Sequence, residues 1–196
     1  MGESGQVCAD TRLILSNKKL PGMKALVTGF DPFGGDAVNP SYEAVRRLPA
    51  RVGTLQVVTA ELPTSFMRAP RRLRALIAHE QPDIVLCVGL AADRDVLSIE
   101  RLAVNLCHAR MADNDGAQPV DKLVIARAPA AYFSTLPTAS IVKALERAGL
   151  RAEMSMSAGA FVCNRVFYGL MHEAAKRKRG KHALRAGFVQ DRKSVV

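Results

Sequence analysis

The chain has 196 residues, 48% of them hydrophobic, which is enough for one domain with a substantial core. It has neither an apolar run long enough to span a membrane nor a signal peptide, so we expect a cytoplasmic protein with no membrane partner. The formal net charge of +10 would suit nucleic acid, but no aromatic residues interleave with the basic clusters to form a stacking platform. We therefore predict no nucleic-acid partner and interpret the clusters as solvated helix faces. They are Arg68, Arg71, Arg72 and Arg74; residues 176–181; and Arg192 with Lys193.

Strand and helix patterns alternate along the chain, which predicts an α/β fold with a largely parallel sheet. Asn39 is expected to cap the first helix, with Pro40 at the first helical position. The predicted strands cover residues 23–30, 55–62, 83–89, one or two segments within 96–107, 151–156 and 184–189. The predicted helices cover residues 40–47, 70–80, 135–148 and 159–178.

Residues 157–164 form a small-residue turn that runs into a helix, with Cys163 in the first helical turn. The positive helix end and the unpaired backbone amides favour a thiolate there, which is one way to build a nucleophile. The alternative is a small apolar residue packed under a sheet, since buried free cysteines are common. The chain's four cysteines have neither paired nor metal-type spacing, so we expect free thiols in a reducing compartment.

A nucleophilic thiol needs a base, usually histidine, and a third group that orients it. His172 follows Cys163 on the same helix at a spacing that makes it face away. His79 and His182 are interpreted as surface residues, and His108 as a packed or edge residue. No histidine is therefore placed beside the thiol by spacing alone.

Glu100 interrupts an apolar segment, where a buried acid needs a partner. It could orient a catalytic group. Helix capping, or an ion pair with the neighbouring Arg101, is the alternative interpretation.

Several short segments, in this order, are specific together although each is weak alone. They read VTGFDPFGG at 27–35, NPS at 39–41, LPT at 62–64, QPD at 81–83 continuing to Gly89, ERLAVN at 100–105, AR at 109–110 with DN at 113–114, PAAY at 129–132 and SAGAFVCN at 157–164. With these segments the chain resembles pyroglutamyl peptidase type I, the pyrrolidone-carboxylate peptidase family of cysteine peptidases.

The resemblance implies a three-layer α/β/α sandwich around a twisted, largely parallel sheet. It implies an enzyme that removes an N-terminal pyroglutamyl residue from peptides through a thiol acyl-enzyme, without metal or cofactor, typically as a homotetramer. By this resemblance Cys163 is the nucleophile, Glu100 orients the catalytic histidine and Arg110 helps to stabilise the oxyanion. Phe30, Phe33 and Phe161 are implied to surround the lactam ring, and Asn39 and Val162 are implied to belong to the same substrate-binding site. Leu90 stands where many members have glutamine.

The resemblance fails at the end of the last matching strand. The family pattern there is Gly-Phe-Ile/Val-His, whereas this chain has Gln190 after Gly187, Phe188 and Val189. Glutamine cannot accept a proton from a thiol, and the family's closing segment and final helix are missing. We therefore expect an incomplete domain over residues 23–189 with little or no activity. A non-native or disordered extension over 1–22 precedes it, and a non-family tail over 190–196 follows.

The tail after Gln190 is what a common sequencing adapter encodes in one reading frame, and the adapter's first base would convert a truncated histidine codon to glutamine. We therefore interpret residues 190–196 as adapter read-through. The alternative is a pseudoenzyme that binds pyroglutamyl peptides without cleaving them. The genomic sequence downstream of Val189 distinguishes the two, because a native glutamine codon followed by genomic sequence for the tail would contradict the read-through.

Overall fold

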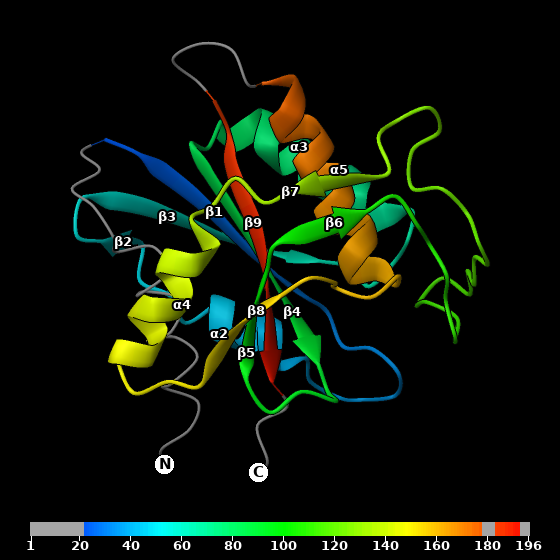
Figure 1. Cartoon of the computed structure of the whole chain (residues 1–196), viewed down its shortest axis with the longest axis horizontal. Coiled ribbons are helices and arrows are strands. Elements are labelled where there is room, and N and C mark those ends of the chain that lie inside the picture. The colour runs from blue at the N-terminus through cyan, green and yellow to red at the C-terminus, as the bar shows by residue number, and fades with distance from the viewer. Residues whose placement is uncertain (1–21, 178–182, 193–196) are drawn as a thin grey trace.

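A central sheet of seven strands organises the molecule, which is described by a computed structural model over residues 22–177 and 183–192 (Figure 1). Its strands are β1 (Lys24–Phe30), β2 (Arg51–Val52), β3 (Leu55–Leu62), β4 (Ile84–Ala91), β5 (Leu97–Glu100), β8 (Ala152–Ser155) and β9 (Arg185–Arg192). They lie in the order β2-β3-β1-β4-β9-β5-β8. A separate two-stranded sheet pairs β6 (Leu102–Val104) with β7 (Ala131–Phe133).

The four strands β3, β1, β4 and β9 are neighbours and run parallel. Strands β1 and β4 are almost continuously apolar and buried, as strands covered on both faces should be. β5 is antiparallel to β9, and β2 is antiparallel to β3. The largely parallel sheet predicted from the sequence is thus confirmed. Because parallel strands share an edge for their carboxyl ends, the loops that follow β1, β3 and β4 gather at one edge.

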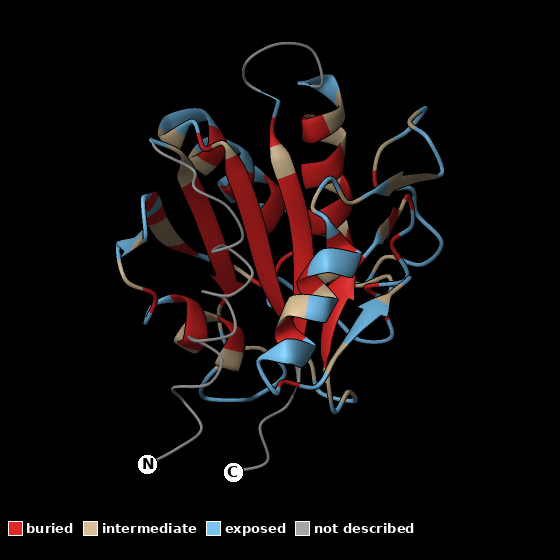
Figure 2. Cartoon of the chain, turned by 60° about the vertical axis from the view of Figure 1, so that its left-hand side comes forward, coloured by how far each residue is buried: buried red, intermediate tan, exposed pale blue. Residues whose placement is uncertain are grey.

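Helices cover both faces of this sheet. α3 (Arg68–Glu80) and α5 (Val162–Lys176) pack on one face, while α2 (Pro40–Val45) and α4 (Thr138–Arg147) pack on the other. Each face has its own apolar core, and Figure 2 shows buried strands between helices whose outer surfaces are exposed. The α/β/α sandwich is therefore confirmed. Within the described ranges, no helix has the length and apolar character needed to cross a membrane.

The local signals in the first half of the chain are confirmed. The Asn39 side chain caps α2 by accepting a hydrogen bond from the Ser41 amide at 3.1 Å, and Pro40 is the first helical residue. α3 begins two residues before Pro70, which therefore lies in the first helical turn, where proline is tolerated. Arg71, Arg72 and Arg74 of the first basic cluster are exposed on α3, as interpreted.

Two differences concern strand lengths. β9 continues to Arg192, beyond the predicted end at residue 189, so Gln190 belongs to a central strand. The short strands β2 and β7 were not predicted, because two or three residues carry no readable alternation. Residues 1–21, 178–182 and 193–196 lie outside the described part, and with them most of the expected extension, His182 and the end of the tail.

Gly29 lies where β1 approaches α2 most closely, and a Cβ there would be 2.5 Å from Tyr42 Cα and 2.6 Å from Tyr42 N. Because these are backbone atoms, Gly29→Ala should push β1 and α2 apart and lower the free energy of unfolding in urea by about 1–3 kcal/mol. Gly169→Ala in α5 is the control, since a Cβ there meets nothing within 4 Å and alanine favours the helix. Equal stability of Gly29→Ala and the unmodified chain would contradict this packing.

Candidate active site

Cys163 is the second residue of α5 and follows Phe161, the N-cap, and Val162. The turn before it needs glycine at position 159, where φ is +75°. The expected place of the cysteine in the first helical turn is confirmed. The residue is only partly buried, unlike Cys87 and Cys107, which are packed in the core.

Two cavities meet at Cys163. The first, of about 240 Å³, lies between the loops that follow β1 and β3 and the start of α5. The second, of about 300 Å³, lies between the turn after β4, the segment around His108 and the turn before Cys163. The first is lined by all five residues that the resemblance implies for substrate binding: Phe30, Phe33, Asn39, Phe161 and Val162. The second is lined by Arg94, His108, Arg110 and Gln190 among others, and Leu90 lines both.

Aromatic side chains form much of the first cavity. The Phe161 ring packs against Phe33 and Phe66, each with a centroid distance of 5.1 Å. The polar side-chain atoms of Asn39 form hydrogen bonds within the chain: Nδ2 donates to the Asp31 carbonyl at 2.8 Å, and Oδ1 accepts from Ser41. The cavity is therefore mainly apolar, and Asn39 stabilises the loop that lines it.

Gln190 and Cys163 converge over Gly89. β9 places Gln190 between Gly89 of β4 and Ser98 of β5. A Cβ on Gly89 would lie 2.7 Å from Gln190 Oε1 and 2.9 Å from Cys163 Sγ, so only glycine leaves room for both side chains. Gln190 Oε1 is buried without a hydrogen-bond partner among the described residues.

Glu100 is completely buried on the same face of the sheet as Gln190, because Ser98 and Glu100 of β5 lie opposite Gln190 and Phe188 of β9. Arg94 Nη1 donates to Glu100 Oε1 at 2.9 Å. Burial raises the pKa of the Glu100 carboxyl, while the Ser155 hydroxyl and the Arg94 charge act in the opposite direction.

The partner of Glu100 is Arg94 and not Arg101, so the alternative ion pair is wrong. The Arg101 guanidinium lies 5.4 Å from the centroid of the Phe133 ring instead. Arg94 also donates to the Ser157 carbonyl at 2.8 Å, and so it links the acid to the turn before Cys163. Arg94 is not among the residues predicted from the sequence. Its signal was a cation in the turn that precedes the strand with an interior acid.

The thiol is not activated in this arrangement. Burial raises the pKa of Cys163 to about 11; the Gln190 amide lowers it, and the Glu100 charge raises it further. At pH 7 a thiol with this pKa is about one part in ten thousand thiolate. The helix N-terminus is thus outweighed by desolvation, and the thiol needs a base.

Of the described histidines, His172 and His79 lie away from Cys163, whereas His108 lines the second cavity. His172 hydrogen-bonds Tyr132 at 2.8 Å, away from the thiol, and His79 is exposed; both match the sequence interpretation. His108 differs, because it is exposed and lines the second cavity, with Nδ1 2.8 Å from Asp121 Oδ1. Its backbone amide donates to the Ala160 carbonyl at 2.9 Å, which fixes it beside the turn before Cys163.

Comparisons with known proteins identify the family. The family profile described as pyroglutamyl peptidase matches residues 23–190. The chain is 51% identical over 165 residues to pyrrolidone-carboxylate peptidase 1 of Ralstonia nicotianae, covering 84% of this chain and 75% of that protein. The chain belongs to the pyroglutamyl peptidase family. It is therefore, by family, a thiol omega peptidase within the hydrolases, as the resemblance implied.

Other relatives agree in sequence and structure. Pyrrolidone-carboxylate peptidase of Thermosipho melanesiensis is 46% identical over 167 residues, covering 85% of this chain and 81% of that protein. The crystal structure of pyroglutamyl peptidase I from Bacillus amyloliquefaciens matches with a TM-score of 0.82 at 44% identity, covering 87% of this chain and 80% of that chain. Pyrrolidone carboxyl peptidase from Thermococcus litoralis gives a TM-score of 0.84 at 37% identity, covering 88% and 78%. The family match includes Gln190, one residue more than the resemblance did.

The raised thiol pKa has a measurable consequence. Iodoacetamide should modify Cys163 slowly at neutral pH, and the rate should rise about tenfold per pH unit without a plateau below about pH 9.5. Mass spectrometry of the peptide that contains Cys163 separates this reaction from those of the other cysteines. Gln190→Leu should slow the reaction, since it removes an amide that lowers the thiol pKa. An alkylation rate that levels off near neutral pH would contradict a raised pKa of the Cys163 thiol.

Proposed function

We propose that this chain carries the binding site and nucleophile of a peptidase that hydrolyses the amide bond after an N-terminal pyroglutamyl residue. The supporting observation is a single thiol, Cys163, at the wall of a small aromatic cavity. A pyroglutamyl group has no charged amine, so a small apolar cavity selects it over an ordinary N-terminus. With the ring held by Phe30, Phe33 and Phe161, the carbonyl of the amide bond to be cleaved faces the Cys163 thiol.

The chemistry proposed is acyl transfer in two steps. The Cys163 sulfur attacks the pyroglutamyl carbonyl carbon and the amide C–N bond breaks. The thiol proton passes to the amine of the remaining peptide, which leaves through the second cavity. The backbone amide of Cys163 and the Arg110 guanidinium, which lines that cavity, stabilise the oxyanion. Water then hydrolyses the thioester, releases pyroglutamate and restores the thiol.

The base is the missing part of this scheme. A side chain at position 190 lies beside Cys163 and on the sheet face that carries Glu100. A histidine there could take the thiol proton while Glu100 orients its ring. The side-chain amide of Gln190 can donate to sulfur but cannot accept its proton. We therefore propose that the chain with Gln190 hydrolyses pyroglutamyl amides very slowly or not at all.

Activity measurements test the role of position 190. The chain with Gln190 should release no chromophore from a pyroglutamyl 4-nitroanilide. A version with Gln190→His and a C-terminal segment taken from a relative should release it, and adding Cys163→Ala to that version should abolish release. Comparable turnover by the chain with Gln190 would sink the proposal and point to another base, with His108 the first to replace.

A second candidate is a binding protein without catalytic activity. It keeps the first cavity, called the ring cavity from here on. It is favoured by one observation: Gln190 lines the second cavity and leaves the first complete. Calorimetry with a pyroglutamyl peptide should show intact ligand bound, with affinity lost in Phe30→Ala and kept in Cys163→Ala. Absence of binding by the unmodified chain would eliminate this candidate.

We further propose that the protein works in the cytoplasm, without metal or cofactor, as a homo-oligomer and, as in its family, a tetramer. Large apolar side chains on the surface support self-association, notably Leu123, 62% exposed, and Phe133, 61% exposed. Sedimentation equilibrium tests the assembly, and a monomer at micromolar concentration would contradict it.

A further inference from the structure

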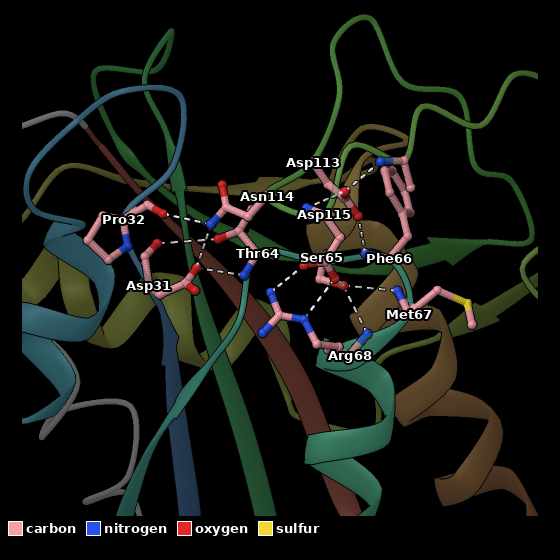
Figure 3. A network of polar contacts seen from close by, with 11 residues as sticks. Asp31, Pro32, Thr64, Ser65, Phe66, Met67, Arg68, Asp113, Asn114 and Asp115 are labelled. Carbon is pink, nitrogen blue, oxygen red and sulfur yellow. Dashed lines mark hydrogen bonds and ion pairs between the residues drawn. The ribbon is translucent and has the colours of Figure 1, made fainter.

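Three consecutive residues, Asp113, Asn114 and Asp115, tie the irregular segment after β6 to two other parts of the chain (Figure 3). Asn114 contacts the loop after β1. Asp113 and Asp115 contact the segment between β3 and α3. From the sequence, Asp113 and Asn114 were noted as one of the short segments that carry the family resemblance, without a role of their own. The contacts of this region give it a more specific role at the ring cavity.

Asn114 holds the two residues that precede Phe33. Its Nδ2 donates to the Pro32 carbonyl at 2.9 Å and to Asp31 Oδ1 at 3.2 Å, and its backbone amide donates to the Thr64 carbonyl at 3.1 Å. Asp31 Oδ1 also accepts from the Thr64 amide at 2.6 Å. The Asn114 side chain thus holds Asp31 and Pro32, while its backbone amide and the Asp31 carboxylate link this loop to Thr64, just after β3.

Asp113 holds Phe66 in a similar way. Its carboxylate, only 6% exposed, accepts from the Phe66 amide at 2.7 Å and from the amides of Asp115 and Ala117 at 2.9 and 2.8 Å. Charge-assisted bonds of this kind are stronger than neutral ones. The neighbouring residue on the same tripeptide therefore fixes the second aromatic side chain.

Phe33 and Phe66 are the two rings that pack on Phe161, each at 5.1 Å. Phe161 leads directly into Val162 and Cys163. Consecutive residues of one loop therefore anchor both aromatic neighbours of Phe161, which lines the first cavity together with Cys163.

Phe33 depends more on its anchor than Phe66 does. After Phe33 come Gly34 and Gly35, with φ of +69° and +90°. A Cβ at Gly35 would meet no atom within 4 Å, and one at Gly34 would meet only the end of the Met111 side chain at 3.9 Å, so little packs against the loop on that side. The bond there is the one that the Asp36 amide donates to the Phe33 carbonyl at 3.3 Å. Phe66, in contrast, is buried and is followed closely by α3. The position of Phe33 is thus set mainly from its N-terminal side, where Asn114 acts.

We propose that Asn114 is a positioning residue that sets the width of the ring cavity by fixing Phe33 against Phe161, and so determines affinity for the pyroglutamyl ring. This rests on the proposed function. Asn114 does not line the cavity and acts through the Asp31 to Phe33 segment.

Asn114→Ala tests the proposal, with Asp115→Ala as the matched control. Asp115 belongs to the same tripeptide, but its side chain pairs with Arg68 and Ser65, and none of its bonds reaches the loop of Phe33. In calorimetry on the full chain, Asn114→Ala should bind pyroglutamyl-alanine about 5- to 10-fold more weakly, the loss of about one hydrogen bond. The alkylation rate of Cys163 should not change. Asp115→Ala should keep the affinity and lower only the melting temperature.

A measurement without ligand keeps this inference separate from the proposed function. In NMR spectra of the chain with labelled phenylalanine, the ring contact between Phe33 and Phe161 should weaken in Asn114→Ala and persist in Asp115→Ala. The contact between Phe66 and Phe161 serves as the internal reference. An unchanged Phe33 contact would overturn the inference even if the peptide binds. A weakened contact in a chain that binds no pyroglutamyl peptide would uphold the positioning and reject the function.

Discussion

The close approach over Gly89 is the constraint on which the site depends. The parallel strands β4 and β9 bring Gly89 beside Gln190. Because Gly89 has no side chain, Cys163 Sγ at the start of α5 can lie close to the same residue. Cys163 lines both cavities, so they meet at the thiol. Any side chain at position 89 would separate Cys163 from residue 190. The pairing of β4 with β9 therefore sets the distance between Cys163 and residue 190.

Burial gives this arrangement its electrostatic character. Desolvation raises the pKa of both Cys163 and Glu100, and so it disfavours two negative charges close together. Arg94 partly compensates the acid and connects it to the turn before the thiol. A cationic histidine at position 190 would stabilise both anions at once, whereas a neutral amide stabilises them weakly. The choice between an ionisable and a neutral side chain at position 190 therefore affects the whole charged cluster.

The sequence predicted the features that depend on local signals. The apolar runs of β1 and β4, the Asn39 cap and the small-residue turn before Cys163 all act within a few residues. Interactions between segments were not predictable in the same way. Glu100 pairs with Arg94 because the turn before β5 folds back over the strand, while the adjacent Arg101 packs on Phe133. The exposure of His108 and the bonds of Asn114 arise in a segment without periodicity, whose course only tertiary contacts define.

The place of β9 has a consequence for how the protein folds during synthesis. β9 comes last among the described strands in sequence, yet it lies between β4 and β5 in the middle of the sheet. Until residues 185–192 leave the ribosome, β4 and β5 each present an unpaired edge, and β5 with β8 cannot join the rest of the sheet. Such long-range pairing is slow, and exposed edges invite association with other chains. The nascent chain should therefore depend on chaperones until the strand that carries residue 190 inserts.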